Sequence, residues 1–332
     1  MIVSEIKEDY LKSLEEFVYN HPHGNFFQSP KTYNFYKSLP AFNPVLLLSF
    51  DESGEINGSL LALIQKEKGL LKSFLSRRCI VIGGPIIKDG NKNVADKLLN
   101  ELVNKSKNQS IYIEFRNLFA PDGIKDVFEK KGFKYKEHLN FIVNIESPEE
   151  NFRKLNDNRQ RQVKKSQKSG TEIIYPEDII EVSQFYLILK RLYKERVKKP
   201  LPDFSFFESF YNKADIGKYF LIKYKEKVIG GIMCPVFKDK IYEWYVCGLD
   251  TEFKNQAPSV LATWAAIEYA SRNGLKYFDF MGAGSPDSDY GVREFKSKFG
   301  GELVEYGRFV RVNNKFLYFI GKLGLKLLGF LK

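Results

Sequence analysis

Residues 276–308 read KYFDFMGAGSPDSDYGVREFKSKFGGELVEYGR, and this stretch decides the fold class. The apolar run 277–280 predicts a short buried strand, and the Gly-, Ser- and Asp-rich run 281–291 predicts a loop at its carboxyl end. Phe295 and Lys296 follow that loop. Because α/β folds bind ligands at the carboxyl edge of a sheet, we expect a ligand site here. The alternative is a surface loop with a lysine whose hydrogen bonds are satisfied.

The order of predicted elements on the N-terminal side of this stretch occurs twice. Strand, strand, helix and strand are predicted first over residues 45–50, 59–65, 94–105 and 110–115, and again over residues 219–224, 228–237, 258–272 and 277–280. Repetition at a long period predicts two copies of one α/β unit. We place them at residues 1–150 and 151–312, and we expect a last helix, 313–332, to pack back on the first unit.

The composition limits the classes of partner and site that the protein can have. The 332 residues carry a net charge of +11, with three cysteines and three histidines that show neither metal-ligand spacing nor a disulfide framework. Such a charge favours an anionic partner, namely a nucleic acid, a phosphorylated substrate or a membrane surface, although solubility alone is an alternative. The charged N-terminus and the lack of an apolar run of ~18–20 residues predict a cytoplasmic protein.

Two segments between the copies are basic. Arg161, Lys164, Lys165 and Lys168 follow the spacing i, i+3, i+4 and i+7, so a helix would place all four on one face. Such a face predicts an anion opposite, and a solvated linker helix is the alternative. Residues 197–202, VKKPLP, predict a basic extended strip because proline restricts the residue before it.

The last 18 residues, KFLYFIGKLGLKLLGFLK, form a basic amphipathic pattern. On a helix, Lys315, Lys322 and Lys326 fall within a narrow arc, and Leu and Phe fill most of the remainder. This pattern suits a helix that lies on an anionic membrane surface, at the inner face for a cytoplasmic protein. A helix docked on a core is the competing interpretation.

The pattern Asp279-Phe280-x-Gly282, followed by Gly291-x-x-x-Phe295-Lys296-x-x-Phe299-Gly300, resembles the Fem family of peptidoglycan-bridge aminoacyltransferases. Residues 25–29, NFFQS, residues 83–85, GGP, and the basic helix 159–170 are weaker marks of the same resemblance. It implies an α/β (α+β) fold of two tandem acetyltransferase-like (GNAT) units, each a mixed twisted sheet flanked by helices. It also implies transfer of an aminoacyl group to the peptide amine of a phosphorylated cell-wall precursor.

The resemblance implies a role for particular residues. Lys296 would stabilise the oxyanion, and Glu114 or Asp279 would accept a proton, although this chain lacks the acid-proline ending that the family usually has near Glu114. Substrate-binding residues are expected to be Phe295, Tyr290, Arg116, Arg159, Arg161, Lys165, Arg196, Lys199 and Tyr245.

The acyl donor is expected to be aminoacyl-tRNA, with acyl-CoA less favoured and no tightly bound cofactor. Acetyltransferases bind the CoA pyrophosphate on a glycine-containing turn that enters a helix, whereas residues 255–259 read NQAPS. Two alternatives remain open. One is an acyltransferase that acts on an amino sugar of a nucleotide- or lipid-linked polysaccharide precursor, and the other is a non-catalytic basic module that binds RNA or a membrane.

Overall fold

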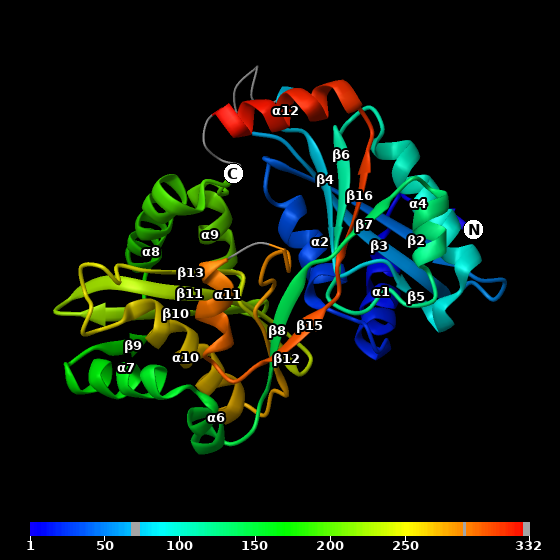
Figure 1. Ribbon diagram of the computed structural model, residues 1–332. Coiled ribbons are helices and arrows are strands. Elements are labelled where there is room, and N and C mark those ends of the chain that lie inside the picture. The colour runs from blue at the N-terminus through cyan, green and yellow to red at the C-terminus, as the bar shows by residue number, and fades with distance from the viewer. Residues whose placement is uncertain (68–73, 288–289, 328–332) are drawn as a thin grey trace. The chain divides into compact units, whose positions relative to one another are not determined.

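The computed structural model describes residues 1–67, 74–287 and 290–327, and it divides into two compact units (Figure 1). Unit 1 comprises Met1–His138 and Glu305–Lys332, and unit 2 comprises Leu139–Val304. Each unit has one mixed sheet flanked by helices, which confirms the predicted fold class. Among the described residues, no helix combines the length and hydropathy needed to span a bilayer.

The sheet of unit 1 runs in the order β1-β2-β3-β4-β6-β16-β7, with β5 beside β3. Its neighbours are antiparallel except β4 and β6, which are parallel. The strands are β1 Ile2–Val3, β2 Phe42–Phe50, β3 Ile56–Gln65, β4 Arg78–Ile82, β5 Ile86–Ile87, β6 Tyr112–Arg116, β7 Lys134–Lys136 and β16 Arg308–Val312. The helices are α1 Glu8–Asn20, η1 Phe26–Gln28, α2 Pro30–Lys37, η2 Lys88–Gly90, α4 Lys92–Ser106, α5 Lys125–Lys130 and α12 Lys315–Leu327.

Strand β3 shows how the apolar pattern builds the core of unit 1. Leu60, Ala62 and Ile64 point to one face, where they pack in a cluster with Leu98 and Leu102 of α4. Side chains alternate across a strand, so the intervening residues face the opposite side of the sheet, on which α1 and α2 lie. The sheet is thus covered on both faces.

The family marks at residues 25–29 and 83–85 form one feature of unit 1. The Asn25 side chain donates to the carbonyl of Gly83 (2.6 Å), and Gln28 Nε2 donates to the carbonyls of Leu61 (3.1 Å) and Ile82 (2.8 Å). Gly83 has φ +62°, and a Cβ there would meet the Asn25 side chain at 2.7 Å. Buried amides therefore hold the strand ends together, which is a structural role.

The sheet of unit 2 runs in the order β15-β8-β14-β12-β11-β10-β9, with β13 beside β11. Its strands are β8 Leu139–Asn144, β9 Glu172–Ile174, β10 Gly217–Tyr224, β11 Lys227–Phe237, β12 Lys240–Tyr242, β13 Tyr245–Gly248, β14 Tyr277–Asp279 and β15 Glu302–Glu305. Its helices are α6 Pro148–Lys154, α7 Asp157–Lys168, α8 Ile179–Leu192, η3 Tyr193–Val197, α9 Phe204–Tyr211, α10 Pro258–Arg272 and α11 Gly291–Ser297. Figure 1 shows α8 and α9 on one side of β10, β11 and β13, and α10 and α7 on the other.

The unit boundaries differ from the predicted positions, 150 and 312. Strand β8 pairs with β14, so unit 2 already begins at Leu139. Strand β16 pairs with β6 and β7, so the chain returns to the sheet of unit 1 before the last helix. Each unit therefore depends on a strand that sequence order assigns to the other, and local pattern cannot reveal such long-range pairing.

The C-terminal helix α12 contacts unit 1 through Tyr318, whose ring lies edge-on to Tyr112 of β6 at 5.6 Å between centroids. Phe316 and Phe319 remain 71% and 65% exposed. The helix therefore combines a docked side with an exposed aromatic side.

Candidate functional site

Strands β12 and β14 diverge at the edge that carries the sequence motif. They run parallel with Tyr242 opposite Asp279, and the Glu243 N–H still donates to the Asp279 carbonyl at 2.8 Å. The next residue, Trp244, donates instead to Met233 of β11 (3.1 Å). The chain thus leaves β14 directly after Glu243, and a side chain from another element can enter between the two strands.

Asp279 anchors the loop that follows β14. Its fully buried Oδ1 accepts from the backbone N–H of Met281 (2.8 Å) and from Asn140 Nδ2 (2.7 Å), and Asn140 Oδ1 accepts from Gly282 N (2.7 Å). Burial raises the pKa of Asp279, although the positive charge of Lys240 opposes this shift. These contacts favour a structural role for Asp279 over the predicted role of proton acceptor.

Tyr290 fixes the far end of the same loop. It directly precedes α11, and its ring lies against Gly284, where a Cβ would meet a ring carbon at 2.8 Å. Gly284 has φ +83°, a conformation that favours glycine. The ring therefore needs a glycine beneath it.

Lys296 enters between the diverging strands from α11 and is only 8% exposed. Its Nζ donates to the carbonyls of Phe280 (2.6 Å) and Gly282 (3.0 Å) and lies 2.9 Å from Glu243 Oε1. An ammonium has three hydrogens, so these acceptors satisfy it completely. The structure thus places a buried, fully coordinated positive charge at the predicted sheet edge.

Glu243, the carboxylate partner of Lys296, was not predicted from the sequence. It is 4% exposed, and among the described residues its Oε2 has no hydrogen-bond partner. Burial raises the pKa of Glu243, the charge and hydrogen bond of Lys296 oppose that shift, and neighbouring Asp279 adds to it. An acidic residue inside an aromatic strand, YEWY, was the available sequence signal.

Phe295 and Arg159 join the motif helix to α7. The Arg159 guanidinium lies 4.5 Å from the Phe295 ring centroid and 5.4 Å from that of Phe299, and its Nη1 donates to Gln162 (2.7 Å). A cation over two aromatic rings is a stabilising contact. Because Arg159 is buried and contacts these rings, it stabilises the packing of α11 against α7.

The remaining basic residues of α7 are exposed on a single face, as predicted: Arg161, Lys164, Lys165 and Lys168. Val163 and Ser166 face inward, and the Ser166 hydroxyl donates to the carbonyl of Gln256 (2.6 Å), just before α10. The basic face therefore belongs to a helix that is fixed to its unit.

Arg196 and Lys199, in η3 and just after it, are both exposed. Arg196 lies in η3, which starts at Tyr193, and the Tyr193 ring lies 6.2 Å from that of Tyr245 on β13. The Phe207 ring lies 5.1 Å from Tyr245. The first residue of η3, Tyr193, thus lies beside the predicted binding residue Tyr245.

Glu114 and Arg116, in contrast, belong to β6 of unit 1. Glu114 Oε1 accepts from Arg308 (2.7 Å), and its Oε2 accepts from Arg116 (3.0 Å). Burial alone would raise the pKa of Glu114, but the two guanidinium groups outweigh it and lower the pKa to about 2. A carboxyl group with so low a pKa is a poor proton acceptor. The structure therefore favours an ion-pair role for Glu114.

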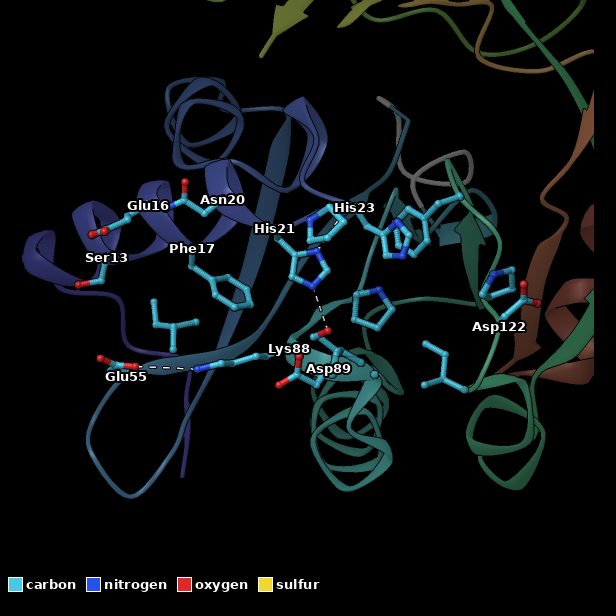
Figure 2. Close-up of a pocket in the computed structure, with 18 of the residues that line it drawn as sticks. Ser13, Glu16, Phe17, Asn20, His21, His23, Glu55, Lys88, Asp89 and Asp122 are labelled. Atoms are coloured by element: carbon cyan, nitrogen blue, oxygen red, sulfur yellow. Dashed lines mark hydrogen bonds and ion pairs between the residues drawn. The ribbon is translucent and has the colours of Figure 1, made fainter. Parts of the chain in front are cut away.

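Unit 1 also contains a pocket of about 680 Å³, shown in Figure 2. It lies at the carboxyl ends of β4 and β6, and its wall includes carboxylates and histidines: Glu16, Glu55, Asp89, Asp122, His21 and His23. His21 contacts the carbonyl of Ile87 (3.0 Å), and His23 stacks on Phe119 at 4.2 Å. No predicted site residue lines this pocket.

Comparisons with known proteins agree with the motif. Residues 205–323 match the sequence model of the FemAB family. The chain is 31% identical to the aminoacyltransferase FemA of Staphylococcus aureus over 80 residues, which span 23% of this chain and only 19% of FemA.

The fold extends the likeness to nearly the whole chain. A crystal structure of FemX superposes with a TM-score of 0.71 at 17% identity, covering 96% of this chain and 99% of FemX. A tandem GNAT protein of clavulanic acid biosynthesis superposes with a TM-score of 0.55 at 10% identity, covering 95% of this chain and 98% of that protein. The predicted resemblance is confirmed: the chain has a tandem acetyltransferase-like fold, and its residues 205–323, which include Lys296 and Glu243, match the FemAB family.

Proposed function

We propose that this protein is an N-acyltransferase that moves an aminoacyl group from aminoacyl-tRNA to the peptide amine of a peptidoglycan precursor. The observation that carries the proposal is Lys296, whose buried ammonium lies between diverging strands inside the segment that matches the FemAB family. FemA, to which this chain is 31% identical over 80 residues, is an aminoacyltransferase.

The reaction develops a negative charge that the Lys296 ammonium can stabilise. A neutral amine nitrogen attacks the ester carbon, forming the C–N bond and a tetrahedral oxyanion. Collapse breaks the ester C–O bond; the nitrogen loses one proton and the leaving oxygen gains one, so the step balances. Lys296 stabilises the oxyanion, and since all three of its hydrogens are in use, the oxyanion replaces one acceptor. The Gly282 carbonyl, at 3.0 Å on the loop, is the most distant of the three.

The start of α10 supports tRNA over CoA as the donor. Pro258 at the first helical position has no N–H, and the Ser259 N–H already donates to the Asp250 carboxylate (3.1 Å). A carboxylate at this helix end occupies the place where a pyrophosphate would bind and repels it. The exposed basic face of α7 offers positive charge to tRNA phosphates instead.

We further propose that α12 holds the enzyme at an anionic membrane surface, where a lipid-linked precursor would lie. Phe316 and Phe319 are the exposed aromatic side chains of this helix, and Lys315 is exposed beside them. Aromatic insertion combined with lysine charge is the pattern of interfacial helices.

The direct test incubates the protein with charged tRNAs and muramyl-peptide precursors and follows the mass of the acceptor. We expect a gain of one or more aminoacyl groups, and acyl-CoA should give none. Lys296→Met should lower turnover by ~10²–10³ while acceptor affinity changes little, the usual result of losing one oxyanion donor. Equal turnover by the Lys296→Met variant would exclude this role for Lys296.

A further inference from the structure

We propose that Glu243 is the positioning residue of the transfer site, holding the Lys296 ammonium between β12 and β14 and keeping it charged while the oxyanion forms. This proposal rests on the acyl-transfer function proposed above. The geometry is direct: Oε1 lies 2.9 Å from Nζ, and both side chains are at least nine-tenths buried. Glu243 therefore acts on the reaction through Lys296 and not by touching the substrate.

The hydrogen bonds of Lys296 show why Glu243 is the fixed partner. Two of the three acceptors, the carbonyls of Phe280 and Gly282, are neutral and belong to the end of β14 and its loop. The third is a carboxylate, and charge-assisted hydrogen bonds are about twice as strong as neutral ones. The Glu243 backbone N–H is bonded to the carbonyl of Asp279, so the sheet holds the backbone of Glu243, whereas Gly282 belongs to the loop. When an oxyanion displaces one of the two carbonyls from Lys296, the Glu243 carboxylate remains bonded to the ammonium.

The titratable groups around Glu243 come from three elements. Lys296 of α11 faces it directly, Asp279 of β14 lies nearby, and the Cys234 thiol of β11 is within its electrostatic influence. Lys240 acts on Asp279, which already has two donors of its own. Within the described residues, Lys296 is thus the cation that Glu243 contacts through Oε1, and the second carboxylate oxygen of Glu243, Oε2, has no hydrogen-bond partner.

The first test is Glu243→Gln, which retains an oxygen acceptor for Lys296 but removes the charge. Removing a partner that orients a charged group from behind costs about 10–100-fold at metal sites, and we expect a similar fall in kcat with KM unchanged. A buried lysine without its anion has a lowered pKa, so the alkaline limb of the kcat profile should move down by ~1–3 pH units. The matched control is Glu294→Gln, which breaks the exposed ion pair between Glu294 and Lys298. This variant should leave kcat and the alkaline limb of its pH profile unchanged.

The second test combines the variants. In a Lys296→Met background, Glu243→Gln should lower kcat no further, because Glu243 acts only through Lys296. If Glu243→Gln does not fold, Glu243→Asp takes its place. The shorter side chain keeps the negative charge but moves the carboxylate away from Lys296, so kcat should fall while the alkaline limb of the kcat profile stays at the same pH. A full additional loss in the double variant, or an unchanged kcat and pH profile in a folded single variant, would overturn the proposal.

A readout without activity separates this proposal from the proposed function. Lysine labelled with ¹³C at Cε gives a signal for Lys296 that is identified by its loss in Lys296→Met. Titration should show this amine deprotonating at lower pH in Glu243→Gln than in the native protein. Identical titration curves would refute the role of Glu243, even if no acyl donor had been found. A shifted curve without transfer activity would retain the ion-pair role and reject the transferase assignment.

Discussion

Replacing Lys296 with methionine should destabilise unit 2 by about 3–5 kcal/mol, beyond its effect on turnover. Methionine fills a similar volume, so the main loss is electrostatic. Glu243, 4% exposed, would keep its negative charge without a partner, and removing one member of a buried pair typically costs about 3–5 kcal/mol. The carbonyls of Phe280 and Gly282 would lose their donor as well.

The loss should depend on pH in a defined direction. The pKa of Glu243 already lies above its ordinary value of 4.5, and Lys296 holds it down, so Lys296→Met should raise it further. A carboxyl that binds protons more tightly in the folded state gives most stability at low pH, and this contribution falls as pH rises above 4.5. The variant should therefore be less impaired at pH 5 than at pH 8. Adding Glu243→Gln should recover part of the stability at pH 8.

Urea unfolding followed by tryptophan fluorescence measures this effect, because both tryptophans, Trp244 and Trp264, belong to unit 2. The control is Lys298→Met, which removes the exposed partner of Glu294 and should change stability by less than about 1 kcal/mol. A Lys296→Met variant whose free energy of unfolding lies within about 1 kcal/mol of the native value at pH 8 would refute the contribution of the buried ion pair, and so would a double variant with Glu243→Gln that is still less stable.

Three further outcomes are expected. The pKa of Glu114 is lowered from 4.5 to about 2, so its ion pairs should contribute about 3 kcal/mol to the free energy of unfolding at pH 7, and this contribution is lost as pH falls from about 5 to 2. The acid unfolding of Glu114→Gln should therefore lack this loss, and an unchanged acid transition would argue against the ion pairs. Phe316→Ser with Phe319→Ser should abolish co-sedimentation with anionic vesicles without lowering the melting temperature, and equal sedimentation would end the membrane proposal. Arg161→Glu with Lys165→Glu should weaken tRNA binding and flatten its salt dependence by ~0.7–0.9 per lost phosphate contact, and an unaltered slope would exclude the α7 face as a tRNA surface.

Local pattern predicted much of the fold. The apolar alternation of β2 and β3 and the helical spacing of α4, α7 and α10 follow from residues adjacent in sequence, so their positions could be predicted. The strand pairing could not: β8 and β16 join sheets that lie across the predicted boundaries. Pairing of distant strands depends on competition among all possible partners, which short windows of sequence do not contain.

The candidate site divides in the same way. The sequence by itself determined that Phe295 and Lys296 follow a glycine-rich loop at a strand end and that α7 carries a basic face, because spacing along the chain fixes both. Only the tertiary structure decided which charges meet: Lys296 with Glu243, and Glu114 with Arg308. These partners come from different strands and helices, and the cost of burying an unpaired charge selects among the packings that the same local pattern allows.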